Sequence, residues 1–151
     1  MIEPGAQAPD FDAPTSKGTN LKLSSLRGKP VILYFYPKAF TSGCAMETRT
    51  FGELYPKLSA QGVEVIGVSV DDVEKQTAFA ADCKADFPLV ADRNKQIAQS
   101  YGVLGTFQVA KRVTFYIDPS GKVSDVVESM RPGPHTEKAV SKYLQAMGPK
   151  K

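Results

Sequence analysis

A continuous apolar and aromatic run over residues 31–36, Val-Ile-Leu-Tyr-Phe-Tyr, constrains the fold more than any other feature. A run without polar alternation is typical of a strand buried on both faces, as in a parallel sheet covered by helices. Residues 62–70 repeat the pattern and end at Asp71-Asp72, which predicts a helix start. Between the two runs, residues 44–60 carry apolar side chains at helical spacing: Met46, Phe51, Leu54 and Leu58. The order strand, helix, strand predicts a right-handed βαβ unit.

The remaining pattern completes a sheet with helices. It predicts helices over 73–84, 93–101 and 135–147, and strands over 111–118 and 122–128. The turn sequence 118–121 joins these two strands, and residues 11–13 and 20–23 are expected to pair as a hairpin around Gly18. The last helix places these apolar residues on one side: Ala139, Val140, Tyr143, Leu144 and Met147. We therefore expect an α/β, thioredoxin-like fold, with a mixed central sheet flanked by helices on both faces and a short N-terminal β-hairpin.

Composition excludes several classes of function. The chain has 151 residues with no repeat or linker, so we expect a single domain over 1–151. The net charge of +3 is mild and the basic residues are scattered, which argues against nucleic-acid binding. The first residues lack a signal-peptide pattern and no run is long enough for a membrane span, so a cytoplasmic protein is expected. A single histidine and two cysteines cannot build the usual zinc site, and no cofactor is expected.

The two cysteines are therefore either inert core residues or redox-active ones. Cys44 follows a short loop after the first buried strand and lies near the first turn of a helix, where free amides and the helix dipole favour a thiolate. The Thr41 hydroxyl and the amides of Gly43 and Cys44 can donate to a small substrate, and Gly43 lets the backbone approach it closely. Pro37 would close one side of this pocket. Together these groups would form a pocket for a small, neutral molecule with two oxygen atoms.

The spacing Pro37-x-x-x-Thr41-x-x-Cys44 resembles the active-site signature of the peroxiredoxins. Four further segments resemble those of the same family: Ala8-Pro-Asp-Phe11, Leu26-Arg-Gly-Lys-Pro-Val31, Arg112-Val-Thr-Phe-Tyr-Ile-Asp-x-x-Gly121 and Gly133-x-His-x-Glu137. The short length and Glu47 make the chain similar to the bacterioferritin comigratory protein or PrxQ subgroup of the AhpC/TSA superfamily.

This resemblance implies roles for individual residues. Cys44 would be the peroxidatic cysteine, Thr41 its hydrogen-bond partner and Arg112 the arginine that stabilises the thiolate and holds the peroxide. Glu47 would orient Arg112 or another basic group. Ser42 departs from the subgroup, which usually has proline there.

A second departure concerns the resolving cysteine. Many members carry it five residues after the first, where this chain has Arg49. The resemblance then implies that Cys83 in the 73–84 helix resolves the sulfenic acid of Cys44 to an intramolecular disulfide, which thioredoxin or a similar dithiol would reduce. Both helices are expected to unwind in part, since disulfide geometry needs Cα atoms within about 7 Å. Polar neighbours of Cys83 suggest a site close to solvent, and a monomer is common in the subgroup.

Other interpretations stay open from the residues alone. Cys83 is four residues from Phe79 and could belong to a core-facing stripe, leaving a one-cysteine enzyme that an external thiol resolves. His135 lies at a helix start, where a surface or capping histidine is the commoner case. A redox-switched binding or chaperone module is the non-enzymatic alternative. A CxxC oxidoreductase and a cysteine hydrolase are disfavoured, because the chain lacks a CxxC motif and His135 is its sole candidate base.

Overall fold

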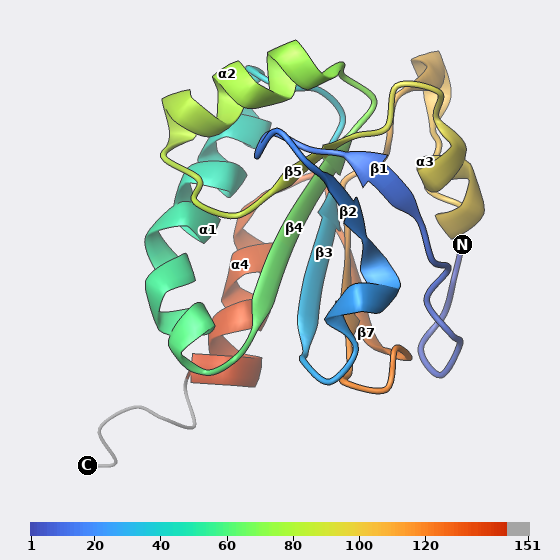
Figure 1. Ribbon diagram of the computed structural model, residues 1–151, viewed down its shortest axis with the longest axis vertical. Helices are drawn as coiled ribbons and strands as arrows, with labels where there is room; N and C mark the ends of the chain where they lie inside the picture. Colours follow the sequence, from blue (N-terminus) through green and yellow to red (C-terminus); the bar gives the residue numbers. More distant parts are fainter. Residues whose placement is uncertain (145–151) are drawn as a thin grey trace.

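A five-stranded mixed sheet forms the centre of the computed structural model, which describes residues 1–144 (Figure 1). The strand order is β5-β4-β3-β6-β7, in which β3 runs parallel to β4, β4 runs parallel to β5, and β6 is antiparallel to β3 and β7. The strands are β3 (Val31–Phe35), β4 (Glu64–Ser69), β5 (Leu89–Ala91), β6 (Val113–Ile117) and β7 (Val123–Glu128). All five residues of β3 are buried, as expected for a central strand.

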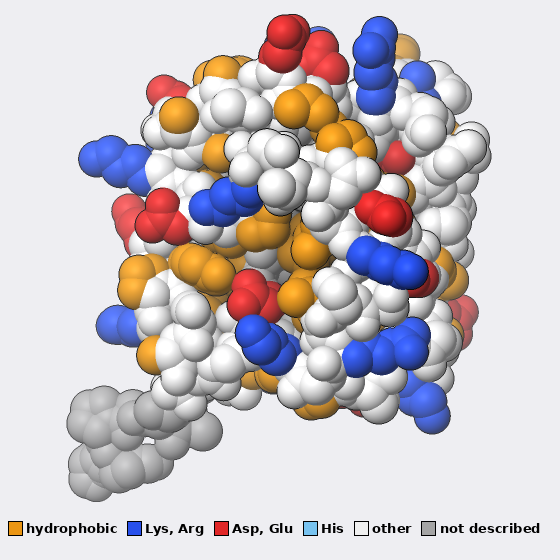
Figure 2. All heavy atoms as spheres, viewed as in Figure 1, with side chains coloured by type: hydrophobic (Ala, Val, Ile, Leu, Met, Phe, Trp, Pro, Cys, Tyr) orange, Lys and Arg blue, Asp and Glu red, His pale blue; other side chains and the backbone are white. Residues whose placement is uncertain are grey.

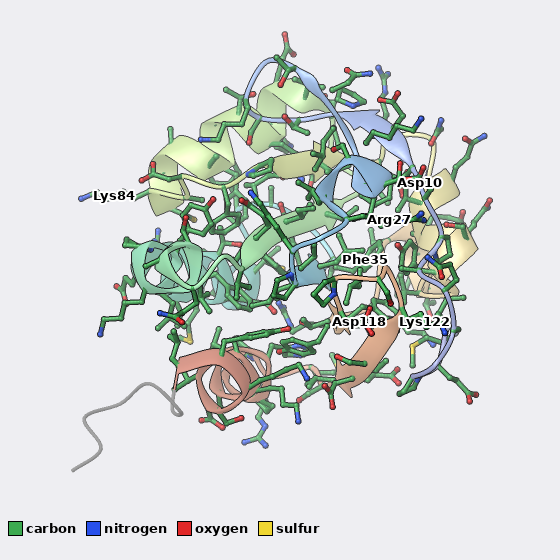
Figure 3. The ribbon with its side chains drawn as sticks, turned by 60° about the horizontal axis from the view of Figure 1, so that its bottom comes forward. Asp10, Arg27, Phe35, Lys84, Asp118 and Lys122 are labelled. Carbon is green, nitrogen blue, oxygen red and sulfur yellow. The ribbon has the colours of Figure 1, made fainter. Side chains whose placement is uncertain are left out.

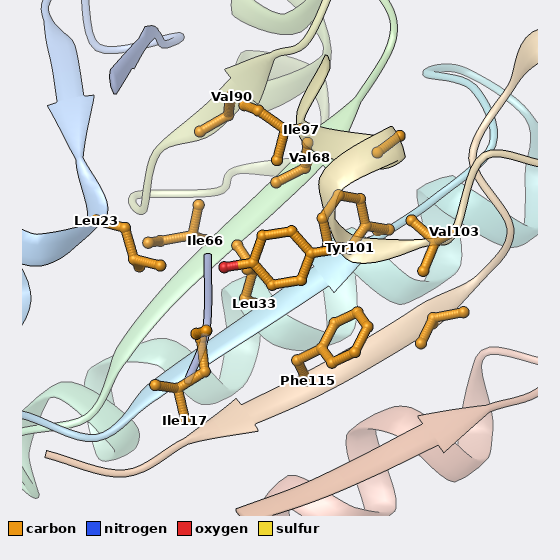
Figure 4. Close-up of a cluster of buried hydrophobic side chains, with 14 of the residues drawn as sticks. Leu23, Leu33, Ile66, Val68, Val90, Ile97, Tyr101, Val103, Phe115 and Ile117 are labelled. Carbon is orange, nitrogen blue, oxygen red and sulfur yellow. The ribbon is translucent and has the colours of Figure 1, made fainter. Parts of the chain in front are cut away.

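Two layers cover the sheet. On one face lie α1 (Ser42–Ala60), α2 (Val73–Cys83) and α4 (Gly133–Ala139), which continues as a π-helical turn over Val140–Leu144. On the other face lie α3 (Gln96–Tyr101) and the N-terminal segment, with Tyr101 packed over Phe115 (Figure 4). The hairpin β1 (Asp12–Pro14) and β2 (Asn20–Lys22) is antiparallel, and Gly18 adopts the positive φ that its turn requires. The prediction of a mixed sheet with helices on both faces and an N-terminal hairpin is confirmed.

Several predicted boundaries need correction. The pattern missed β5, because three residues are too few to establish a period. The α3 helix begins at Gln96 rather than near 93, since the buried carboxylate of Asp92 accepts hydrogen bonds from the amides of Ile97 and Ala98. Met46 is 59% exposed and was wrongly placed in the apolar stripe of α1. Met147 of the last predicted helix lies outside the described residues.

The charged side chains are scattered over the surface, as the sequence indicated. Acidic and basic side chains are interspersed on the face seen in Figure 2, with no broad basic stripe. None of the helices within residues 1–144 is both long and apolar enough to cross a membrane.

Candidate active site

Cys44 lies in the first turn of α1, directly after the loop that leaves β3. Thr41 is the N-cap residue, and its carbonyl accepts the first helical hydrogen bond, from Ala45 N at 2.8 Å. The Cys44 side chain is completely buried, although the neighbouring turn is open to solvent. The thiol is therefore held at the positive end of a long helix and shielded from bulk water.

The sheet brings Arg112 to this thiol from far along the chain. Val113 is the register partner of Phe35 in the β3–β6 pair, so Arg112 lies beside the end of β3 where the loop toward Cys44 begins. Arg112 Nη2 is 3.4 Å from Cys44 Sγ, and Arg112 Nε donates to the carbonyl of Met130 at 3.0 Å. The guanidinium thus has a fixed orientation against the sulfur.

Glu47, one helical turn after Cys44, holds the other side of this guanidinium. Its Oε1 accepts from Arg112 Nη1 at 2.6 Å, and its side chain is fully buried. Burial raises the pKa of Glu47 to about 7, although the charge and hydrogen bond of Arg112 act in the opposite direction. Burial also opposes the charged form of Arg112, but Glu47 and Cys44 outweigh it and raise the pKa of the guanidinium. A permanent cation therefore lies between a carboxyl group and a sulfur.

Gly43 and Pro37 shape the space around this cation. A Cβ atom on Gly43 would lie 3.0 Å from Arg112 Nη2, so only glycine leaves the guanidinium its present position. Pro37 and Arg112 both border a groove of about 500 Å³, whose wall also includes Val109, Ala110 and Met130. The approach to Arg112 is consequently apolar on one side.

Thr41 and Phe40 belong to the loop between β3 and α1. The Thr41 hydroxyl donates to the carbonyl of Lys38 at 2.9 Å, which leaves its oxygen free to accept a hydrogen bond. Phe40 has a φ of 69°, is half exposed and packs edge-on against Phe79 of α2, with ring centroids 5.2 Å apart. The loop is therefore in contact with α2 as well as with α1.

Asp71 holds this loop in place through a hydrogen bond to its backbone. In the sequence, Asp71 was interpreted only as part of a helix start. Its Oδ2 accepts from Ala39 N at 2.8 Å and from the Ser69 hydroxyl at 2.6 Å. Asp72, next to it, is the N-cap of α2 and accepts from Lys75 N. The pair Asp71-Asp72 could have indicated this role, because one aspartate is enough to cap α2 and the other is then available for the loop.

Cys83 occupies the last position of α2 and is a free thiol, as is Cys44. Its side chain is only 3% exposed, but Cys83 lines an open surface pocket together with Arg49 and Asp82, so the expectation of a site close to solvent is confirmed. Sγ lies 3.9 Å from the carbonyl of Ala45, in the first turn of α1. Burial raises the pKa of the Cys83 thiol; Arg49 opposes this effect and Asp82 adds to it. Cys83 is thus a protonated thiol packed beside the turn that carries Cys44.

His135 is the clearest error of the sequence interpretation. A surface or capping position was expected, but the side chain is completely buried between α4 and β6. Its Nδ1 is 2.7 Å from Thr114 Oγ1 and 3.8 Å from Glu47 Oε2, and its Nε2 is 2.9 Å from the carbonyl of Ser129. The histidine was judged from its position at a helix start, which does not reveal which side faces the sheet.

Comparison with known proteins agrees with this geometry. The model of the AhpC/TSA family matches residues 4–126. Peroxiredoxin Bcp of Escherichia coli (strain K12) is 32% identical over 141 residues, which cover 89% of this chain and 90% of that protein. The crystal structure of peroxidoxin BcpB from Mycobacterium tuberculosis is 35% identical, with a TM-score of 0.86 over 93% of this chain and 96% of that one. A cysteine-to-serine variant of PrxQ from Xylella fastidiosa has a TM-score of 0.88 at 27% identity, over 97% and 98% of the two chains.

The fold is therefore that of the thioredoxin-like α/β proteins. The chain belongs to the AhpC/TSA family and, within it, to the Bcp/PrxQ subgroup of peroxiredoxins. It is a thiol peroxidase, an enzyme that reduces hydroperoxides.

Proposed function

We propose that Cys44 is the nucleophile of this peroxidase. The contact that carries the proposal is the one between Arg112 Nη2 and Cys44 Sγ at 3.4 Å, with Glu47 bound behind the guanidinium. A fixed positive charge at this distance favours the thiolate, which is the reactive form of cysteine. Cys83 lacks such a contact with a cation, because Arg49 is engaged with Asp82 at the surface.

The first step transfers one oxygen. The Cys44 thiolate attacks the distal oxygen of R–O–OH, an S–O bond forms as the O–O bond breaks, and the product is a sulfenic acid. The RO⁻ group leaves and takes a proton from water to become ROH. The sulfur is oxidised by two electrons and the peroxide is reduced by two. Arg112 would stabilise the charge that develops on the leaving oxygen, and the amides of Gly43 and Cys44 would bind the peroxide.

Thr41 and Pro37 complete the proposed site. The Thr41 hydroxyl already donates to Lys38 O, so its oxygen is available to accept a hydrogen bond from the peroxide OH. Pro37 offers no amide and, through its ring, limits access to the guanidinium from the groove. A hydroperoxide with an apolar substituent would place that substituent in this groove. The bacterioferritin comigratory protein of Xanthomonas campestris, which is 26% identical, has been studied for alkyl peroxide reduction.

Cys83 is the proposed resolving residue. Its thiol condenses with the Cys44 sulfenic acid, so that an S–S bond forms and water leaves. Support comes from the position of its Sγ beside the first turn of α1, 3.9 Å from Ala45 O. Because disulfide geometry needs Cα atoms within about 7 Å, we expect the first turn of α1 and the end of α2 to open before the sulfurs bond. A one-cysteine cycle, in which an external thiol attacks the sulfenic acid, remains the alternative.

A dithiol protein of the thioredoxin type is the proposed reductant. Its two thiols would give two electrons and two protons to the Cys44–Cys83 disulfide and would leave as a disulfide. A cytoplasmic monomer is the expected working form, since glutathione and thioredoxin systems keep cytoplasmic thiols reduced.

Thiol counting after one equivalent of hydrogen peroxide tests the scheme. We expect wild type to lose two thiols, Cys83→Ser to lose one and form a sulfenic acid, and Cys44→Ser to lose none. Wild type that stops at a stable sulfenic acid would contradict the resolving role of Cys83. Sustained peroxide consumption with thioredoxin, thioredoxin reductase and NADPH is expected only in variants that retain Cys44. Failure of thioredoxin, with turnover on another thiol, would contradict the reductant alone.

A further inference from the structure

One oxygen at the active site has no hydrogen-bond partner. Within residues 1–144, Glu47 Oε2 is the single buried side-chain nitrogen or oxygen without a partner. A buried polar atom without a hydrogen-bond partner destabilises the fold, so its retention needs an explanation. Its neighbour Oε1 is fully engaged with Arg112. The open side of Oε2 faces His135 Nδ1 at 3.8 Å.

The hydrogen bonds of His135 assign its tautomer. The Ser129 carbonyl can only accept, so the ring proton of the neutral form is on Nε2. Nδ1 then accepts from the Thr114 hydroxyl at 2.7 Å. When a proton arrives on Nδ1, this nitrogen becomes a donor, and Glu47 Oε2 is the anionic acceptor within reach after a shift of about 1 Å. The ring and the carboxyl group can therefore hold one proton between them.

The proton on Glu47 and His135 matters for the Cys44 sulfur, because Glu47 and Cys44 contact the same guanidinium. Arg112 has one positive charge and contacts two groups that can be anionic, Glu47 and Cys44. If both are ionised, they compete for that charge, whereas a proton on the buried pair removes the competition. Burial raises the pKa of Glu47 to about 7 and lowers that of His135, so the carboxyl group, ordinarily the stronger acid, holds the proton at least as tightly as the imidazole does.

Few other groups can disturb this balance. The titratable and charged groups that act on the pair are Arg112, Tyr34 and Tyr116, and Cys44 acts on it through Arg112. Burial raises the pKa values of both tyrosines, and Tyr116 donates its hydroxyl to the carbonyl of His135. Both tyrosines therefore stay neutral and add no charge beside the pair.

We propose that His135 is a positioning residue that shares a proton with Glu47 and so determines how much of the Arg112 charge is available to Cys44. This inference rests on the proposed role of Cys44. By thermodynamic linkage, the thiolate favours a proton on the pair to the same extent that the proton favours the thiolate. The effect is reciprocal, so it can be measured at the histidine.

The single histidine of the chain makes the measurement direct. Heteronuclear NMR of the imidazole nitrogens, followed against pH in the reduced protein, reports the protonation of His135 alone. We expect the midpoint to fall by about one pH unit in Cys44→Ser, which removes the thiolate, and to fall similarly in Glu47→Gln. Identical titrations in the three proteins would overturn the proposal.

Thr114 supplies a matched pair of variants. Thr114→Val removes the hydroxyl that donates to Nδ1, so protonation of this nitrogen becomes easier and the midpoint is expected to rise. Thr114→Ser keeps the hydroxyl and is expected to titrate as wild type. A midpoint that falls in Thr114→Val, or that moves equally in both variants, contradicts the assigned hydrogen bond and with it the proposal.

The kinetic consequence is a pH profile. The rate constant for the first reduction of hydrogen peroxide is expected to have an inflection near neutral pH in wild type, and this inflection is expected to shift in His135→Asn, in which Glu47 no longer shares its proton with an imidazole. Circular dichroism checks that His135→Asn is folded; if it is not, the NMR comparison decides alone. A normal inflection in folded His135→Asn would contradict the proposal. A protein without peroxide turnover but with coupled histidine titration would instead overturn the proposed role of Cys44.

Discussion

Cys44 and Cys83 lie in the same buried cluster between the sheet and its helices, yet their surroundings differ in charge. Cys44 contacts a guanidinium that is fixed by a carboxylate and a carbonyl. Cys83 faces the carbonyl of Ala45, and the cation that opposes the rise of its pKa, Arg49, is 54% exposed and paired with Asp82 at 3.1 Å. Two thiols of similar burial thus have different electrostatic surroundings, a fixed cation beside Cys44 and a carbonyl beside Cys83.

The largest expected effect comes from the two arginines. Arg112→Ala removes the fixed cation and is expected to lower the rate constant of Cys44 with hydrogen peroxide by about 10²–10³-fold. The matched variant Arg49→Ala removes an exposed ion pair worth about 0.2–1 kcal/mol and is expected to leave that rate constant nearly unchanged. Single-turnover kinetics of both variants measure this. Equal losses in the two would mean that the contact at Cys44 is not the cause of its reactivity.

Two glycines beside the cysteines give the next effect. In Gly43→Ala the new Cβ would lie 3.0 Å from Arg112 Nη2, so the guanidinium must shift, and we expect about 10²-fold slower peroxide reduction with little change in stability. In Gly52→Ala the Cβ would meet the backbone carbonyl of Lys84 at 2.9 Å, and overpacking is expected to cost about 1–3 kcal/mol.

Gly133→Ala is the control for both glycine variants, because its Cβ would meet only Glu137 Oε2, at an ordinary 3.6 Å. Urea unfolding and peroxide kinetics on the three variants separate the two effects. A Gly52→Ala protein with full stability, or a Gly43→Ala protein with full activity, would show that these contacts relax freely.

Stability against pH probes the buried acid beside Cys44. The pKa of Glu47 is raised by burial, so the folded state holds its proton more tightly than the unfolded chain. Its contribution is present below about pH 4.5 and is lost as pH rises to about 7, on the order of 3 kcal/mol. His135 acts oppositely: its lowered pKa makes stability fall as pH drops below about 6.5.

Denaturant unfolding between pH 4.5 and 7.5 measures both slopes. Relative to wild type, Glu47→Gln is expected to gain stability with rising pH, and His135→Asn to lose it. Slopes of the same sign in the two variants would contradict this assignment.

The smallest expected effect is at the end of α2. Lys84 is the C-cap residue with a φ of 56°, and its side chain points outward from the helix end (Figure 3). Lys84→Gly is expected to stabilise the fold by up to about 1 kcal/mol, since glycine adopts this conformation without strain. If α2 must open for Cys83 to react, the same variant should form the disulfide more slowly after peroxide addition. Faster disulfide formation would count against opening at this helix end. Lys75→Gly, in the first turn of α2, is a destabilising control.

The sequence by itself predicted the elements that depend on short-range residue patterns. The buried runs at β3 and β4, the helix between them and the Pro37-Thr41-Cys44 spacing can be read from adjacent residues, because strand burial and helix starts depend on short-range pattern. The prediction that Cys44 lies at a helix start is confirmed, as is the hairpin around Gly18.

The resemblance to the peroxiredoxins implied that Arg112 acts on Cys44, but the tertiary structure shows how distant side chains meet at this residue. Arg112 reaches the sulfur because β3 pairs with β6 in the register Phe35 to Val113, and nothing in the sequence fixes that register. His135 is buried against Glu47 because α4 packs on the same sheet face as α1, a choice of helix face that a short polar segment does not encode. Local pattern thus placed Cys44 at a helix start, whereas strand register and helix packing assembled the charges that surround it.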